Sequence, residues 1–273
     1  MPDHQNGLQV LQEPDPGYRG QLLDVVAVHG LNGDPVNTWT HKGSVLRSST
    51  MWLTDLLPEK LPGARIMTFG YDATLVGNTS TGGVQSNAGV LLADLKYARE
   101  RYEGKNRPIV FVGHSLGGII IKQALRFAHD NETEFSDIAK CAKGIVFFGT
   151  PHRGADAARW ANLATDIAAA VFRRSPSKFV EALRENSEDL MNISEDFCLI
   201  ASNYAIFSFY EENIYTSLGK VIVEQTSAVM GLPNEEAMML GGNHSSMCKF
   251  KRGDRRFEIV WRHIQRAAKG PLR

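Results

Sequence analysis

The segment spanning residues 108–129 constrains the fold more than any other part of the chain. Pro108–Gly113 has the sequence PIVFVG, which is apolar on both faces, as in a central strand of a parallel sheet. A glycine-rich turn follows, and Leu116–His129 then has the apolar spacing of a helix. A strand that turns sharply into a helix is a building unit of parallel α/β sheets, so this segment predicts that architecture.

The same alternation of strands and helices continues along the chain. It predicts an α/β fold with a mostly parallel central sheet and helices on both faces. We expect a single domain over residues 1–273, with an extended N-terminal segment at 1–20 and a helical, lid-like insertion at about 155–200. The other expected strands are Leu22–His29, Arg65–Tyr71, Gly144–Phe148, Ile206–Tyr210, Val221–Val223 and Ala237–Leu240, and further helices are expected at Val84–Tyr102 and Arg255–Ala268.

Composition and charge exclude several classes of protein. The 273 residues are 43% hydrophobic and 22% charged, which is ordinary for a globular chain and argues against disorder. Lys+Arg and Asp+Glu both number 30, so the net charge is zero and no general nucleic-acid binding is expected. A local basic cluster is interpreted either as solvated surface or as a peripheral contact with an anionic partner or membrane. It contains Lys249, Lys251, Arg252, Arg255 and Arg256.

No targeting or membrane-spanning segment is evident in the sequence. Residues 1–20 lack the basic start and apolar centre of a signal peptide, and no apolar run approaches the roughly 20 residues that span a bilayer. The three cysteines, Cys141, Cys198 and Cys248, are odd in number and lack metal-site spacing. We therefore expect a reducing, cytoplasmic location, no disulfide framework, no metal and no cofactor.

The sequence GHSLG at Gly113–Gly117 matches G-x-S-x-G, in which a serine is exposed on a strained turn. Alone, the pattern is weak evidence, and a glycine-rich turn without chemistry would also produce it. With a strand before it and a helix after it, the pattern predicts that Ser115 is the nucleophile of an α/β-hydrolase fold. The positive N-terminal end of the following helix would then point at the reacting centre.

A serine hydroxyl needs a base, and the functional groups of a parallel sheet gather beyond the carboxyl ends of its strands. His244 follows the last expected strand within a Gly-Gly-Asn loop, and in this fold the base comes last in chain order. His152 also follows a strand and is the competing candidate.

The acid that orients the imidazole is less constrained by the sequence. Glu211 ends the strand that precedes the base-bearing strand, which is the expected place for it. Glu224 lies closer to His244 in sequence, and Glu212 is a further alternative.

A tetrahedral intermediate needs two backbone N–H donors. Leu116, just after the nucleophile, is expected to supply one, and Leu31, in the HGLNG loop after the first strand, the other. Further residues at these strand ends are expected to line the substrate pocket. They are His29, Gly30, His114, Thr150, His152 and Arg153.

Several short motifs occur together along the chain. They are Val28–Gly33, Thr38–Trp39, Gly113–Gly118, Phe148–Gly154, Phe209–Glu211, Ser227–Ala228, Asn243–His244 and Cys248–Lys249. Together they resemble the serine-active-site lipase-like hydrolases, and are most similar to the hydrolase domains at the N-terminus of fungal NACHT-type (STAND) immune-like receptors. The resemblance covers roughly residues 7–250 and implies an esterase, lipase or phospholipase-type activity. Asn243 departs from the pattern, which has an acidic residue before the base, and the G-x-x-x-x-G-K-[ST] loop of such receptors is absent.

These observations predict a serine hydrolase that cleaves a small-molecule carboxylic ester, of a lipid or another acyl compound, through an acyl-enzyme on Ser115. An acyltransferase or thioesterase is the first alternative, because only the attacking acceptor differs. A non-catalytic signalling module of an immune-like receptor is the second. The apolar face within residues 155–200 is interpreted either as core packing or as a lid or acyl pocket.

Overall fold

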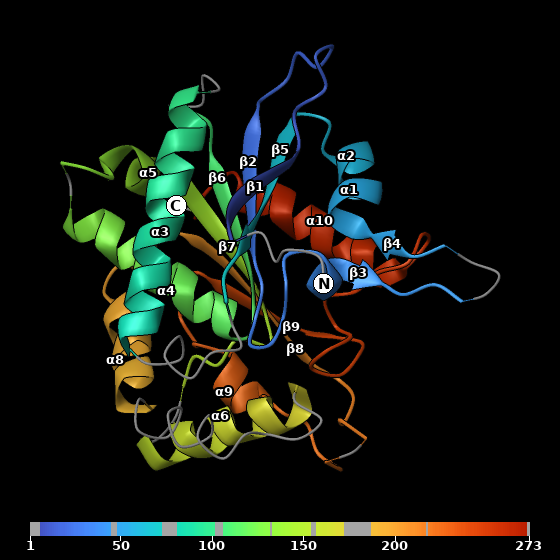
Figure 1. The fold of residues 1–273 in the computed structure, drawn as a ribbon, viewed down its shortest axis with the longest axis vertical. Helices are drawn as coiled ribbons and strands as arrows, with labels where there is room; N and C mark the ends of the chain where they lie inside the picture. Colours follow the sequence, from blue (N-terminus) through green and yellow to red (C-terminus); the bar gives the residue numbers. More distant parts are fainter. Residues whose placement is uncertain are drawn as a thin grey trace.

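The computed structural model describes residues 6–44, 48–72, 81–101, 106–131, 133–153, 157–171, 187–216 and 218–271. In this part of the chain, one seven-stranded sheet has the order β1-β5-β2-β6-β7-β8-β9 (Figure 1). Every neighbouring pair is parallel except β1 and β5, which run antiparallel. The expected α/β-hydrolase architecture, a mostly parallel sheet with helices on both faces, is confirmed.

The elements follow one another along the chain in the alternation that the sequence predicts. The sheet consists of β1 (Gly7–Gln12), β2 (Leu23–Val28), β5 (Ala64–Gly70), β6 (Ile109–His114), β7 (Ala142–Phe148), β8 (Ala205–Glu211) and β9 (Glu235–Leu240). A separate antiparallel pair consists of β3 (Thr40–His41) and β4 (Thr50–Met51). The helices are η1 (Asn37–Trp39), α1 (Trp52–Asp55), α2 (Leu57–Lys60), α3 (Thr81–Arg101), α4 (Leu116–Asp130), α5 (Ser136–Cys141), α6 (Ala157–Val171), α8 (Ser187–Cys198), η3 (Ala201–Asn203), α9 (Gln225–Ala228) and α10 (Arg255–Ala267).

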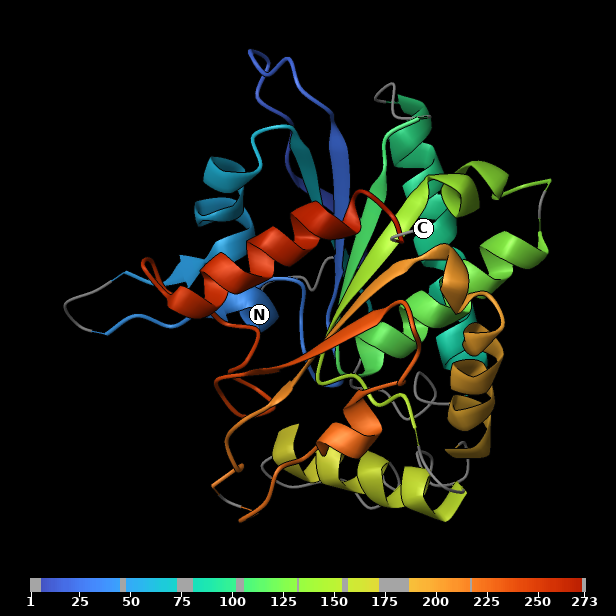
Figure 2. The same cartoon turned by 180° about the vertical axis from the view of Figure 1, so that it is seen from behind.

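Helices cover both faces of the sheet, and each face has its own hydrophobic core. α3, α4, α5 and α8 lie on one face, and α1, α2 and α10 lie on the other (Figures 1 and 2). Successive residues of β2 alternate between these cores: Val26 and Val28 pack on the first side, and Val25 and Ala27 on the second. Burial on both faces is why the central strands are mostly apolar.

The carboxyl ends of β2, β6, β7, β8 and β9 meet at one edge of the sheet, because these strands are parallel. α6 and α9 lie beyond that edge, in the lower part of Figure 2. The candidate catalytic residues lie at or beyond these strand ends: Ser115 follows β6, Glu211 is the last residue of β8, and His244 lies in the loop after β9. Among the described helices, none combines the length and apolar character needed to cross a bilayer.

Two local expectations differ from the structure. Part of the N-terminal segment, Gly7–Gln12, is a strand that pairs antiparallel with β5 at the sheet edge. The strand expected at Val221–Val223 is wrong: the amides of Ile222 and Val223 donate to the carboxylate of Glu211 instead of to a neighbouring strand. The insertion expected at about 155–200 falls only partly within the described residues, where it contains α6 and α8.

Candidate active site

Ser115 lies between β6 and α4 in a backbone conformation that residues with side chains rarely adopt. Its φ is 52° and its ψ is −124°, so the turn is strained. The turn is also crowded: a Cβ on Gly117 would come within 2.3 Å of two carbonyl oxygens at the end of β2. A Cβ on Gly118 would lie 2.2 Å from the Thr150 hydroxyl oxygen. These close approaches explain the glycines that follow the serine.

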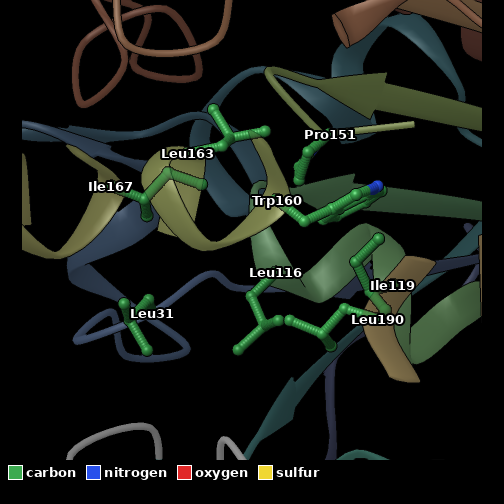
Figure 3. A pocket seen from close by; sticks show the side chains of 8 residues that line it. All are labelled: Leu31, Leu116, Ile119, Pro151, Trp160, Leu163, Ile167 and Leu190. Atoms are coloured by element: carbon green, nitrogen blue, oxygen red, sulfur yellow. The ribbon is translucent and has the colours of Figure 1, made fainter. Parts of the chain in front are cut away.

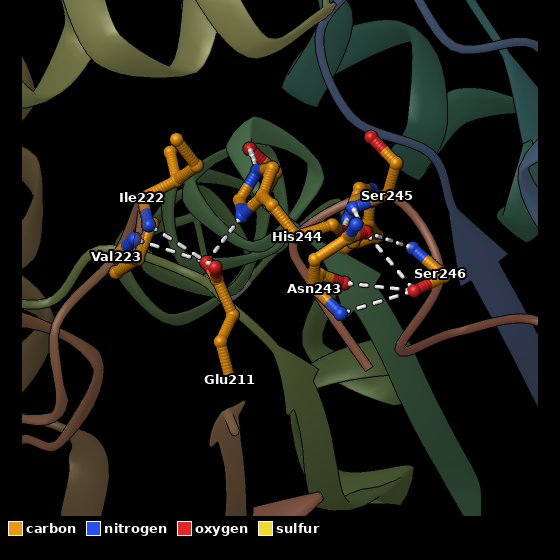
Figure 4. Close-up of polar contacts among 9 residues, drawn as sticks. Glu211, Ile222, Val223, Asn243, His244, Ser245 and Ser246 are labelled. Carbon is orange, nitrogen blue, oxygen red and sulfur yellow. Dashed lines mark hydrogen bonds and ion pairs between the residues drawn. The ribbon is translucent and has the colours of Figure 1, made fainter. Parts of the chain in front are cut away.

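Ser115, His244 and Glu211 form a continuous chain of hydrogen bonds. His244 Nε2 lies 3.0 Å from Ser115 Oγ, and His244 Nδ1 lies 2.7 Å from Glu211 Oε1 (Figure 4). The three residues are 1%, 0% and 5% exposed, respectively. A carboxylate only accepts hydrogen bonds, so Nδ1–H donates to Glu211 and Nε2 is left to accept the serine proton. This arrangement suits a nucleophile, its base and an orienting acid.

Backbone amides hold the carboxylate of Glu211 in place. Val223 N donates to Oε1 at 2.9 Å, and Ile222 N donates to Oε2 at 3.1 Å (Figure 4). The two alternative acids are exposed: Glu224 lies at the start of α9 and Glu212 just beyond β8. Of the three candidates, only Glu211 is hydrogen-bonded to the imidazole.

Two neighbouring side chains shape the loop that carries His244. Nε2–H of His114 donates to the His244 carbonyl oxygen at 2.8 Å. Burial lowers the pKa of His114 to about 3, so its ring is neutral. Asn243 Oδ1 accepts from the amides of Ser245 and Ser246 at 3.2 and 3.1 Å (Figure 4). Asn243 therefore turns the loop, a role that a side-chain oxygen of either amide or carboxylate type can fill.

The two expected oxyanion donors lie on either side of the nucleophile, Leu116 as the first residue of α4 and Leu31 in the loop after β2. Within the described residues, neither amide donates a hydrogen bond to a protein atom. The loop packs directly against the nucleophile, since a Cβ on Gly30 would lie 2.9 Å from Ser115 Cβ. Two unused amides next to the reacting atom suit the stabilisation of a developing oxyanion.

His29 holds this loop rather than facing a pocket. Its Nδ1–H donates to the Gly30 carbonyl at 2.9 Å, and the Tyr71 amide donates to its Nε2 at 3.3 Å. The Tyr71 hydroxyl donates to the His29 carbonyl at 2.9 Å, and the two rings stack with centroids 4.3 Å apart. Burial raises the pKa of Tyr71, so the phenol stays a donor. Sequence reasoning missed Tyr71, although it directly follows β5 at the same sheet edge.

A narrow apolar pocket begins beside the two oxyanion candidates (Figure 3). α4, α6 and α8 supply most of its wall. The lining residues are Leu31, Leu116, Ile119, Pro151, Trp160, Leu163, Ile167 and Leu190.

None of the residues expected to line a substrate pocket lies on the wall of this one. His29, Gly30 and His114 belong to the networks around the nucleophile and base. Thr150 and His152 are buried, and Arg153 is exposed with its guanidinium 2.9 Å from the place of a Cβ on Gly231.

Two members of the basic cluster are engaged in ion pairs. Arg252 pairs with Glu59 at 2.9 Å, and Arg256 pairs with Asp254 at 2.8 Å. Over the described part of the chain, no three His, Cys, Asp or Glu side chains are arranged to hold a metal ion.

The fold and this hydrogen-bond chain define an α/β hydrolase of the serine type. Residues 23–171 match the family model described as "Putative serine esterase (DUF676)". The chain belongs to that family.

Curated relatives and a solved structure are consistent with this membership. The human Protein SERAC1 is 28% identical over 272 residues, covering 92% of this chain and 40% of its own length. The bovine Protein SERAC1 is 29% identical over 280 residues, covering 93% of this chain and 40% of its own length. The chain thus spans about 40% of the length of these relatives. The mature lipase BlEst2 of Bacillus licheniformis has a TM-score of 0.54 at 18% identity, covering 94% of this chain and 95% of its own, which shows the shared fold. The similarity to fungal NACHT-type receptors stays a prediction.

Proposed function

We propose that the chain hydrolyses carboxylic esters of acyl or lipid compounds, with Ser115 as nucleophile, His244 as general base and Glu211 as orienting acid. The observation that carries the proposal is the buried, unbroken hydrogen-bond chain, 3.0 Å from Ser115 to His244 and 2.7 Å from His244 to Glu211. Each link has the donor and acceptor types that acyl transfer requires.

In the first half of the reaction, Ser115 Oγ attacks the ester carbonyl carbon while His244 Nε2 takes the hydroxyl proton. The carboxylate of Glu211 stabilises the resulting imidazolium. The amides of Leu31 and Leu116 donate to the oxyanion of the tetrahedral intermediate. When that intermediate collapses, the alcohol departs with the proton from His244, and the acyl group stays on Ser115.

In the second half, water attacks the acyl-enzyme while His244 again takes a proton. Collapse of the second intermediate returns the proton to Ser115 Oγ and releases the carboxylic acid. Another acceptor in place of water would give acyl transfer, so product analysis with and without an added alcohol distinguishes the two outcomes.

The apolar pocket beside Leu31 and Leu116 supports an apolar acyl group as part of the substrate. We take α6 and α8, which border it, as a cap over the acyl group within a single domain. A peripheral membrane contact through the basic cluster and a cytoplasmic location stay predictions.

A fluorophosphonate probe tests the nucleophile. Native protein should be labelled on Ser115, and Ser115→Ala should lose labelling and at least about a thousandfold of its turnover of p-nitrophenyl butyrate, with an unchanged melting temperature. Ser208→Ala is the matched control, because Ser208 is also buried and its hydroxyl has no partner among the described residues. Labelling of the Ser115→Ala protein, or a native protein that the probe does not label, would refute the proposal.

A further inference from the structure

The pocket in Figure 3 is apolar, but several of its lining residues have polar neighbours along the chain. Each of them follows a lining residue by one position or by one helical turn. The pairs are Ile119 and Lys122 on α4, Leu190 and Ser194 on α8, and Pro151 and His152 after β7. None of these polar groups belongs to the hydrogen-bond chain of the nucleophile.

Lys122 is fully buried without a carboxylate partner. Its Nζ donates to Ser194 Oγ at 3.1 Å and lies over the rings of Phe147 and Phe197 at 5.9 and 5.8 Å. An ammonium group has three donors, and within the described residues only this one hydrogen bond is made. Burial lowers the pKa of Lys122 to about 7, because the more distant Cys198 and Glu235 offset only part of the loss of water. A buried cation this poorly compensated is unusual.

The neighbouring polar groups are also short of partners. Among the described residues, neither ring nitrogen of His152 has a hydrogen-bond partner, nor has Trp160 Nε1. The His152 ring packs on Phe147 at 4.6 Å, the same ring that Lys122 faces. In Figure 3 the indole nitrogen of Trp160 lies on the side of Ile119, away from Leu31 and Ile167.

These unused groups share a chemical character. Lysine and tryptophan can only donate, and a neutral histidine offers one donor. Buried polar groups without partners are rare in proteins, so a cluster of them indicates a bound group that supplies the acceptors. Acceptor oxygens that also carry negative charge would compensate the ammonium as well, and a carboxylate has both properties.

We propose that the acyl pocket continues into a polar subsite, where Lys122, His152 and Trp160 bind a carboxylate at the far end of the acyl chain. The proposal rests on the proposed function, because it takes the acyl group to be attached to Ser115. Lys122 follows Ser115 by seven residues along α4, a rise of about 10 Å. An extended chain advances about 1.2 Å per bond, so about eight atoms span that distance. The substrate class is therefore a medium-length dicarboxylic acid monoester.

Three p-nitrophenyl esters test the subsite: the monoester of octanedioic acid, the octanoate of the same length, and the butyrate, which is too short to reach Lys122. Lys122→Met should lower the ratio of kcat/KM for the octanedioate to that for the octanoate by about tenfold or more, because a charge-assisted hydrogen bond is lost. Turnover of the butyrate should be unchanged. Lys140→Met, which alters an exposed lysine on α5, is the matched control and should change neither value.

Each outcome of this experiment decides the proposal. An unchanged ratio in Lys122→Met overturns the subsite, and so does an equal fall for all three esters, which would make Lys122 structural. If the fluorophosphonate probe does not label native protein, the proposed function and the subsite fail together. If it labels Ser115 and the ratio still does not respond, the subsite alone fails.

A second measurement needs no variant. The octanedioate-to-octanoate ratio of the native protein should be highest where Lys122 is protonated and fall as pH rises above its pKa of about 7, while pH effects common to both esters cancel in the ratio. The other titratable groups that act on Lys122 are Cys198 of α8 and Glu235 of β9, which raise its pKa. His152 stays neutral, because burial and then the charge of Lys122 hold its pKa well below the ordinary value. A flat ratio between about pH 6 and about pH 9 would overturn the proposal.

Discussion

Replacing Glu211 by glutamine tests the electrostatic part of the site with the least change in shape. Oε1 of Glu211 accepts from His244 and from the Val223 amide, and Oε2 accepts from the Ile222 amide. Glutamine must put an NH2 group, which only donates, in one of these places. If the NH2 group faces Ile222, the hydrogen bond from the Ile222 amide is lost. If it takes the place of Oε1, the hydrogen bonds from His244 and from the Val223 amide are both lost. We therefore expect the amide oxygen to remain against His244 Nδ1–H.

In that arrangement the imidazole keeps its orientation, but the imidazolium formed during catalysis loses its counter-charge. Unit charges about 4 Å apart interact by about 4 kcal/mol at an effective dielectric constant of about 20. Because each 1.4 kcal/mol is about a factor of ten, Glu211→Gln should lower kcat/KM by about a thousandfold. The unpaired Ile222 amide should also cost about 1–3 kcal/mol of folding free energy.

The assay is hydrolysis of p-nitrophenyl butyrate, with the melting temperature measured in parallel. Glu224→Gln and Glu212→Gln are the matched controls, since both side chains are exposed and neither is hydrogen-bonded to His244. Each should stay within about twofold of the native protein, as surface substitutions usually do. A larger fall for either control than for Glu211→Gln would refute the assignment of the acid.

Three further changes probe the packing around the site. Gly30→Ala should lower kcat/KM by about 100- to 1,000-fold, because its Cβ would meet Ser115 Cβ at 2.9 Å and displace the oxyanion loop. Gly89→Ala is the control and should leave kcat/KM unchanged, because nothing lies within 4 Å of its Cβ. Equal turnover of the two variants would contradict this reasoning. Lys122→Met should raise the free energy of unfolding, most at and below pH 7 and least near pH 10. The pKa of Lys122 is about 7 in the folded protein and about 10.5 in the unfolded chain, so the unfolded chain binds more protons between those values. Urea denaturation across that range measures the difference, and a constant difference would contradict the reasoning. Asp24→Asn should lower the free energy of unfolding by about 3–5 kcal/mol, because three arginines surround this buried carboxylate. Fluorophosphonate labelling of the folded variant should match that of the native protein.

The sequence was most informative where local pattern and tertiary environment agree. The central strands are buried on both faces, so their apolar runs were recognisable without knowledge of their neighbours. Gly7–Gln12 was missed because it is a partly exposed edge strand whose partner, β5, lies far away in sequence. Val221–Val223 was misassigned because its β-branched residues favour a strand locally, whereas two of its amides are taken by Glu211.

Strand ends also indicated which segments would meet around Ser115, since parallel strands share a carboxyl edge. They left the acid open, because Glu211 and Glu224 both follow apolar segments, and only the path of the chain after β8 brings one of them to His244. Tyr71 and Lys122 have no sequence signature of their own. Lys122 in particular lies where α4 has an apolar face, and its burial depends on α8, which packs against that helix.

α4 links the chemistry at Ser115 to the recognition of the acyl group. The helix begins at the nucleophile, its first turn supplies the oxyanion candidate Leu116 and the pocket residue Ile119, and its second turn carries Lys122. A helix has a fixed rise per residue, so the separation of Leu116 and Lys122 along the backbone is set by α4 and does not depend on loops. The other side of the pocket comes from α6 and α8, which different sequence segments form. Selection for acyl length therefore depends on α4, whereas substitutions at Leu163 or Leu190 should alter the width of the pocket and leave the preferred length unchanged.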